Sequence, residues 1–217
     1  MAINLKNKKV LITAGPTWVK IDRVRVISNA ASAETGILLA KKFSSLGAKV
    51  TLLLGSVNPC CLDRGIRLIR FKFFEELKFL LERELFFKRY DLAIHSAAVS
   101  DYEPASVCQK KIKSGLRNLK LKLKPTPKII NLFRKIHPGI FLVGFKYEVE
   151  ASRKSLIQKA RQLIKTTQAD LVVANTLRKE KYIAYLVTAN KCSGPIFAKS
   201  SAVNTLIKAI KGSIWEK

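Results

Sequence analysis

Strand-like and helix-like segments alternate along almost the whole chain, and this rhythm constrains the fold more than any other feature. Short apolar runs of strand length lie at residues 10–13, 49–54, 92–98, 140–145, 171–174 and 183–188, with an edge-strand pattern at 66–71. Amphipathic runs of helix length lie at residues 36–46, 74–87, 150–165 and 200–211. The alternation predicts an α/β fold with a doubly wound, mostly parallel, Rossmann-like sheet and helices on both faces.

One segment departs from this rhythm. Leu119–Lys124 alternates leucine and lysine with a period of two, which predicts a strand with one lysine-lined, solvated face. We therefore expect a β arm or flap, at about residues 105–127, that projects from the sheet. The sequence contains no internal repeat and no low-complexity linker, so residues 1–217 are predicted to form a single domain.

The charge of the chain is the unusual bulk property. Lysine and arginine number 41 against 15 acidic residues, a net charge of +26 that attracts polyanions. The surplus is spread from Lys6 to Lys217, without a basic tail, a zinc-finger pattern or an interleaved aromatic pattern. We therefore expect no specific nucleic-acid partner, and a basic nucleic-acid-binding protein stays as an alternative.

The sequence also bears on location. The first nine residues are polar and lack the apolar core of a signal peptide, and no apolar run approaches the roughly 20 residues that span a bilayer. The four cysteines have no CxxC spacing and are expected to be reduced thiols. These features predict a cytoplasmic protein with no membrane partner.

The segment between the first strand and the first helix has the residues of a ligand site. A strand, a turn at Gly15 and a helix start form the arrangement that places backbone N–H groups under a phosphate. Here the turn is long and carries Asp22, Arg25 and Asn29. The alternative is a solvated loop with a chance asparagine.

Ligands of doubly wound sheets bind beyond the carboxyl ends of the strands, so the residues there are further candidates. The small pair Ala97 and Ala98 would let a base or ribose approach the backbone closely. Asp101 either binds ribose hydroxyls or a base amine, or caps the following turn. Phe145 and Asn175 follow two later strands.

Several known motifs are absent from the sequence. GxGxxG, GxxxxGK[ST] and GxSxG do not occur, and His95 lies inside an apolar strand, where a packed core histidine is expected. Without paired histidines or a carboxylate cluster we expect no resident metal, although a nucleotide would bring magnesium. Lys111 and Lys113, at the entrance to the arm, could neutralise charge on a transferring phosphoryl group, or could be ordinary surface lysines.

Together these segments resemble the phosphopantothenate–cysteine ligase family. The motifs of the resemblance are Thr13–Thr17, Ile21–Asn29, Ala97–Tyr102, Lys111–Lys113, Val143–Phe145 with Glu148, and Ala169–Asn175. They occur in the family's order over nearly the whole chain. The resemblance implies a stand-alone ligase that joins 4′-phosphopantothenate to L-cysteine through an acyl-nucleotidyl intermediate, using Mg²⁺ with CTP or ATP.

The resemblance also implies residue roles and a homodimer. Asn29 would hold the acyl intermediate and Lys111 would stabilise charge at the phosphates, while Arg25, Asn29 and Asn175 would bind substrate. The nucleotide-binding set would be Gly15, Thr17, Ala97, Ala98, Asp101, Lys113, Pro127, Ile129, Phe145, Lys159 and Lys165. The arm would reach toward the site of the neighbouring subunit.

Five positions depart from the family pattern. Pro16 replaces a turn glycine, Ala33 stands where a glycine is common, Lys128 replaces an acid, and Lys146-Tyr147 replaces an alanine pair. These changes bear mostly on the choice of nucleotide.

A Rossmann-like dinucleotide-binding protein without ligase chemistry is the second alternative to the ligase function.

Overall fold

The protein, described by a computed structural model at residues 4–58 and 62–215, is built on one eight-stranded sheet. Its strands, in spatial order, are β12 (Cys192–Ile196), β11 (Lys181–Val187), β10 (Leu171–Arg178), β9 (Phe141–Val149), β6 (Leu92–His95), β1 (Lys9–Ala14), β4 (Lys49–Leu54) and β5 (Arg67–Arg70). The six strands from β10 to β5 are parallel, whereas β11 and β12 pair antiparallel. The predicted mostly parallel α/β sheet is confirmed.

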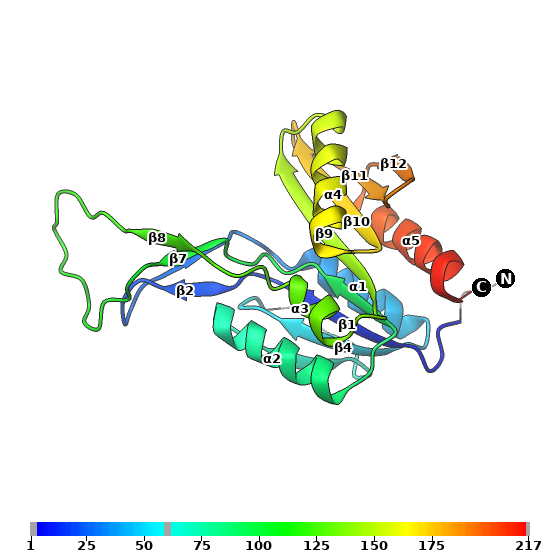
Figure 1. Cartoon of the computed structure of the whole chain (residues 1–217), viewed down its shortest axis with the longest axis horizontal. Helices are drawn as coiled ribbons and strands as arrows, with labels where there is room; N and C mark the ends of the chain where they lie inside the picture. The colour runs from blue at the N-terminus through cyan, green and yellow to red at the C-terminus, as the bar shows by residue number, and fades with distance from the viewer. Residues whose placement is uncertain (1–3, 59–61, 216–217) are drawn as a thin grey trace.

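Helices cover both faces of the sheet (Figure 1). On one face, α1 (Glu34–Ser45) and α5 (Lys199–Ile210) bury Phe43 and Leu206; the short η1 turn (Lys211–Trp215) follows α5. On the other face lie α2 (Phe74–Phe87), α3 (Asn131–Ile136) and α4 (Arg153–Thr167), with Leu77 and Leu156 in the core. β1 contributes alternate side chains to the two cores, as the period of a strand requires.

The second half of the sheet differs from the sequence expectation in extent. β9 and β10 each continue four residues beyond the predicted ends at 145 and 174, and α3 and β12 were not predicted. The extensions pair with each other as far as Leu177 and Val149 but continue past the end of β6, so they are partly exposed and carry polar residues. A strand end predicted from an apolar run marks the end of burial, whereas the hydrogen-bonded pairing of the strand can continue beyond it.

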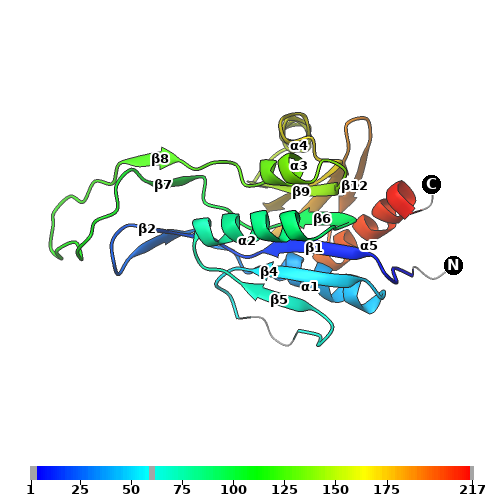
Figure 2. The same ribbon diagram turned by 60° about the horizontal axis from the view of Figure 1, so that its bottom comes forward.

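The arm consists of two antiparallel ribbons that project from the carboxyl edge of the sheet (Figures 1 and 2). The first, β2 (Trp18–Lys20) with β3 (Val26–Ser28), was not predicted; the second is β7 (Tyr102–Pro104) with β8 (Leu123–Pro125). The strand predicted over residues 119–124 is wrong in extent, because β8 begins only at Leu123. Leu119 and Leu121 are 49% and 38% exposed, so the leucine face of the arm is uncovered along with the lysine face.

Two further findings concern location and thiols. Within residues 4–58 and 62–215, no helix has the length and apolar character needed to cross a membrane. Cys108 and Cys192 are free thiols, and Cys60 and Cys61 lie outside the described residues.

Candidate active site

The loops that follow β1 and β6 are bonded to each other at the carboxyl edge. The Ala98 N–H donates to the Gly15 carbonyl at 2.9 Å, and the Thr17 N–H donates to the Ala98 carbonyl at 3.2 Å. A single Cβ at Gly36, in the first turn of α1, would lie 2.3 Å from the Ala14 Cβ. The positive end of α1 therefore lies directly against these two strand ends, where it favours a bound anion.

Asn29 lies at this junction, immediately after β3. Its Nδ2 donates to the carbonyls of Ala98 and Val99, each at 3.1 Å. Both N–H bonds of the amide are thereby used, and Oδ1 has no partner among the residues that the structure describes. The exposed side chain thus presents a fixed hydrogen-bond acceptor at the carboxyl edge.

Thr17 and Ile129, two of the predicted nucleotide contacts, have buried side chains. The Thr17 side chain is completely buried, and its Oγ1 accepts the Ser100 N–H at 2.9 Å. Ile129 is only 3% exposed and lies in the core beneath α3. These side chains shape the loops, and nucleotide contact at both positions stays a prediction. Gly15 is also buried, with φ of 85° and close approach to Gly55.

Asp101 lies beside the segment that returns from the arm. Thr126 joins this returning segment to the loop that carries Asp101. Its hydroxyl donates to the Ser100 carbonyl at 2.6 Å and its N–H to the Asp101 carbonyl at 2.9 Å. Lys128 then forms an ion pair with Asp101 at 2.5 Å, across the exposed Pro127. The base that replaces the family acid therefore compensates the charge of a predicted nucleotide-binding residue.

Phe145 and Asn175 face the α1 and α5 side of the sheet, together with Tyr182 of β11. Phe145 and Tyr182 pack against that core, and Asn175 follows the buried Val173 by two residues, which places it on the same face. The Asn175 Oδ1 and the Tyr182 hydroxyl are both buried without a hydrogen-bond partner, and burial raises the pKa of Tyr182 to about 12. No sequence motif marks Tyr182, because it is an isolated tyrosine in a strand.

The two α4 lysines predicted to bind the nucleotide, Lys159 and Lys165, have different surroundings. Lys159 donates to Glu148 at 2.5 Å, and Lys146 contacts the same carboxylate at 2.9 Å. Lys159 and then Lys146 hold the pKa of Glu148 below its ordinary value. Lys165, in the last turn of α4, is exposed and has no hydrogen bond or ion pair with any described residue.

A buried carboxylate fixes the outer end of the arm. Asp22 is 1% exposed and accepts the N–H groups of Val24 and Arg25, both at 2.7 Å, and of Ile112 at 3.0 Å. The Arg25 guanidinium donates to Asp22 at 2.8 Å and to the Ile112 carbonyl at 3.1 Å. These bonds, the Ile112 N–H first, hold the pKa of Asp22 well below its usual range.

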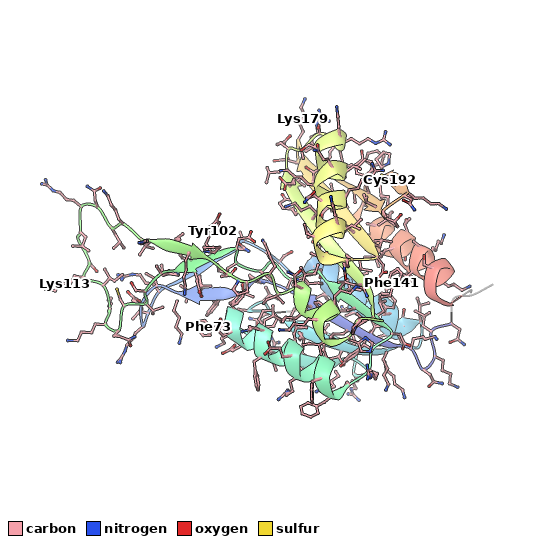
Figure 3. The ribbon with its side chains drawn as sticks, in the orientation of Figure 1. Phe73, Tyr102, Lys113, Phe141, Lys179 and Cys192 are labelled. Carbon is pink, nitrogen blue, oxygen red and sulfur yellow. The ribbon has the colours of Figure 1, made fainter. Side chains whose placement is uncertain are left out.

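This anchor separates Lys111 and Lys113 from Asn29 within one chain. Lys113 lies at the outer end of the arm in Figure 3. Arg25 and Asn29 are four residues apart along the ribbon, or about 13 Å at the rise of a strand. One chain does not bring the predicted catalytic pair together. Arg25, whose substrate contact stays a prediction, is bonded to Asp22 and Ile112.

His95 is a packed core residue, as its apolar strand predicted. It is 9% exposed, its Nδ1 lies 2.8 Å from the Thr13 hydroxyl, and its ring contacts Phe133. Burial lowers its pKa to about 4, so the ring is neutral at pH 7. In the described part of the chain, no three histidine, cysteine or acidic side chains gather in a group that could hold a metal ion.

Comparison with known proteins gives one family. The profile of the DNA/pantothenate metabolism flavoprotein C-terminal domain matches residues 5–213. The Thermococcus kodakarensis coenzyme A biosynthesis bifunctional protein CoaBC is 43% identical over 176 residues, covering 81% of this chain and 43% of the relative. The Methanocaldococcus jannaschii CoaBC is 31% identical over 216 residues, covering 96% and 52%. The chain thus spans about half the length of these relatives.

Solved structures agree with the fold. The DNA/pantothenate metabolism flavoprotein from Streptococcus pneumoniae superimposes with a TM-score of 0.85 at 27% identity, covering 95% of this chain and 99% of that one. A variant of Cab2 in complex with phosphopantothenate-cysteine gives a TM-score of 0.75 at 20% identity, covering 94% and 86%. At that identity the second likeness shows the fold alone.

Proposed function

The chain belongs to the family of the DNA/pantothenate metabolism flavoprotein C-terminal domain, and on that premise we propose that it is a phosphopantothenate–cysteine ligase of coenzyme A biosynthesis. The observation that carries the proposal is the Asn29 amide, fixed by the Ala98 and Val99 carbonyls beside the start of α1. We place the reaction in the cytoplasm and assign it to residues 1–217 acting as one domain.

The proposed reaction has two steps. The carboxylate of 4′-phosphopantothenate attacks the α-phosphorus of CTP or ATP, and pyrophosphate leaves. Mg²⁺ brought by the nucleotide would neutralise charge on the phosphates. The amine of cysteine then attacks the acyl carbonyl, the nucleoside monophosphate leaves, and the amide forms. Nucleotidylation is needed because a free carboxylate would have to expel oxide, whereas a phosphate ester is a good leaving group.

The geometry of Asn29 fits the second step. Because its N–H groups are bonded to backbone, Asn29 can offer only Oδ1, an acceptor. An acceptor at this point can orient a donor of the acyl intermediate, or the attacking amine. The start of α1 lies beside it and favours the phosphate of the same intermediate.

Nucleotide binding is assigned to the loops at the same edge. Ala97 and Ala98 would allow close approach of the nucleotide, and Asp101 with Lys128 would meet its base or ribose. Phe145 and Asn175 lie on the neighbouring strands, and Lys159 and Lys165 would contribute positive charge from α4. Of the two nucleotides, we favour CTP over ATP.

A homodimer would complete the site. Asp22 fixes Ile112, and with it Lys111 and Lys113, at the outer end of the arm, away from Asn29 of the same chain. The arm also exposes Leu119, at 49%, which a second subunit could cover. We infer that each arm delivers Lys111 to the site of the partner subunit.

The direct test incubates the pure protein with phosphopantothenate, L-cysteine, Mg²⁺ and either CTP or ATP, and identifies the products by mass. We expect pyrophosphate, nucleoside monophosphate and phosphopantothenoylcysteine. Asn29→Ala should release pyrophosphate but form no amide, and Lys111→Gln should slow pyrophosphate release on the order of 100-fold, as loss of one charge-stabilising group does. Absence of any cysteine conjugate with both nucleotides would refute the proposal.

The shared site has its own test. When Asn29→Ala and Lys111→Gln subunits are mixed and reassembled, each mixed dimer contains one site with both residues intact. Half of the dimers are mixed, so activity should recover to about a quarter of wild type, as expected for a symmetric dimer. No recovery, with dimers confirmed by light scattering, would show that the arm does not act across the interface.

A further inference from the structure

A cleft lies at the edge of the sheet opposite the candidate active site. The beginnings of β1, β4 and β5 and the end of α2 line a cleft of about 540 Å³, a volume typical of small-molecule sites. The beginning of β1 lies toward the chain termini, away from the arm (Figures 1 and 2). β1 spans roughly 17 Å at the rise of a strand, so the cleft is separate from the candidate active site.

The cleft is strongly basic. We name it the amino-edge cleft and define it by the basic side chains of Lys9, Lys49, Arg67, Lys88 and Arg89, together with Phe87. Its lining contains no aspartate or glutamate from the described residues. Several cations that face one open volume repel each other, and an anion between them removes that repulsion.

One buried carboxylate lies next to the cleft, and its charge is already used. Glu84 is 2% exposed and accepts two hydrogen bonds from Arg67, at 2.6 and 3.0 Å, while Lys88 lies at 3.2 Å. Lys9, Lys49 and Arg89 make no ion pair with any described residue. Besides Glu84, the exposed Asp91 carboxylate accepts the Lys9 backbone N–H at 2.7 Å, so the five basic side chains exceed these two carboxylates by three positive charges.

The same carboxylate gives the cleft a fixed shape. Glu84 also accepts the Tyr90 hydroxyl at 2.7 Å, and that hydroxyl lies 3.1 Å from Thr51 Oγ1. Arg67 is thus held in a two-bond contact, which orients its planar guanidinium before any ligand arrives. Preorganised donors of this kind lose little freedom on binding.

An aromatic surface completes the cleft. Phe87 lines it and is 75% exposed, and its ring lies edge-on to Phe86 with centroids 5.0 Å apart. An exposed phenyl ring beside a group of cations can stack on a planar ring whose substituents carry negative charge.

We propose that the amino-edge cleft binds a phosphorylated small molecule with an aromatic ring, of the nucleoside di- or triphosphate class, independently of the ligase site. The phosphates pair with Lys9, Lys49 and Arg89, Arg67 donates to a phosphate oxygen, and the base stacks on Phe87. This site goes beyond the proposed ligase function and does not depend on it.

The test is calorimetric titration at 150 mM NaCl of the full chain with ADP and, separately, with inorganic triphosphate. The cleft variant is Lys49→Glu with Arg89→Glu, both exposed positions. Its matched control is Lys42→Glu with Lys208→Glu, which changes the net charge equally on exposed positions of α1 and α5. The cleft variant should bind both probes at least tenfold more weakly than the wild type. The control variant should bind them with wild-type affinity.

A third variant separates the aromatic contribution. Phe87→Ala should weaken ADP about fivefold or more and leave inorganic triphosphate unchanged, since stacking acts only on the base. Amide formation should be intact in the cleft variant, which separates this site from the ligase site. The proposal is overturned if the wild type binds neither probe, if cleft and control variants weaken binding equally, or if single-stranded RNA binds and ADP does not.

Discussion

At the scale of single residues, the structure gives several motif residues a task other than ligand contact. Thr17 and Ser100 hold the loops of β1 and β6 together, and Asp22 holds the arm, although each lies in a motif that resembles a ligand site. Asn29 holds a loop and also remains available to a ligand, because its N–H groups donate to backbone carbonyls while its side-chain oxygen has no partner among the described residues. Such residues fix the shape of the loops around the candidate site.

Ala33 provides a test of backbone strain. It precedes α1 with φ of 61°, a left-handed conformation that a Cβ disfavours by roughly 1–2 kcal/mol. Ala33→Gly should relieve this strain and, after the entropic cost of glycine, raise the free energy of unfolding by about 0.5–1 kcal/mol. Urea denaturation measures the difference. Ala33→Val should lower the stability, and a destabilised glycine variant would contradict the argument.

Glu84 provides a test of pH dependence. Burial opposes its ionisation, but Arg67, Tyr90 and Lys88 outweigh burial and lower its pKa from 4.5 to about 2. A lowered folded-state pKa contributes stability above the unfolded pKa, and this contribution is lost as the pH falls from about 4.5 to about 2. Glu84→Gln should therefore cost about 3 kcal/mol at pH 7, as breaking a buried ion pair does.

The pH profile of that variant is the decisive measurement. The difference in the free energy of unfolding between wild type and Glu84→Gln, measured by urea denaturation, should narrow as the pH falls from about 4.5 to about 2. Glu75→Gln, at an exposed position of the same helix, is the control and should change little. A difference in the free energy of unfolding that does not change with pH would show that Glu84→Gln loses packing and not a charge interaction.

At the scale of elements, the arm is held by few contacts and depends on specific bonds. Outside its two short ribbons, residues 105–122 have no regular strand structure, and the leucines at 119, 121 and 123 are exposed. The backbone is tied to the first ribbon by Cys108 N–H to Ile21 carbonyl at 3.0 Å and by the bonds of Asp22. Losing Asp22 should therefore loosen the arm without unfolding the sheet.

Hydrogen exchange tests this. In Asp22→Ala, the amides of Val24, Arg25 and Ile112 lose their acceptor and should exchange faster, while those of β1 and β6 keep their protection. Asp63→Ala, which removes an exposed carboxylate elsewhere, should leave the arm unchanged. Loss of protection across the sheet in Asp22→Ala would mean that the arm and the core unfold as one unit.

At the scale of the whole molecule, the charge acts on stability as well as on ligands. A net charge of +26 on 217 residues causes self-repulsion in the folded state. Raising NaCl from about 0.01 M to 0.15 M shortens the screening length from roughly 30 Å to 8 Å. Thermal unfolding should therefore shift upward over this range. The Lys42→Glu, Lys208→Glu variant should show a smaller shift, and a melting temperature that falls with salt would contradict this.

The family assignment and the fold class could both be read from the sequence. Apolar periodicity marked β1, β4, β6 and the four long helices, because these elements are buried on a regular face. It did not mark α3, β12 or the ribbon of β2 and β3, because these elements are short or partly exposed. Their pairing comes from neighbours distant in sequence.

The sequence by itself determined the sheet, its helices and the polar residues at the carboxyl edge, because burial period and strand-end position are local properties of the chain. Only the tertiary structure decided which of those residues are open to a ligand. It turned Thr17 inward and freed the Asn29 oxygen, and it set Lys111 apart from Asn29. It also assembled the amino-edge cleft from four separate elements. Hydrogen bonds and charge proximity depend on contacts across the fold, which no local pattern encodes.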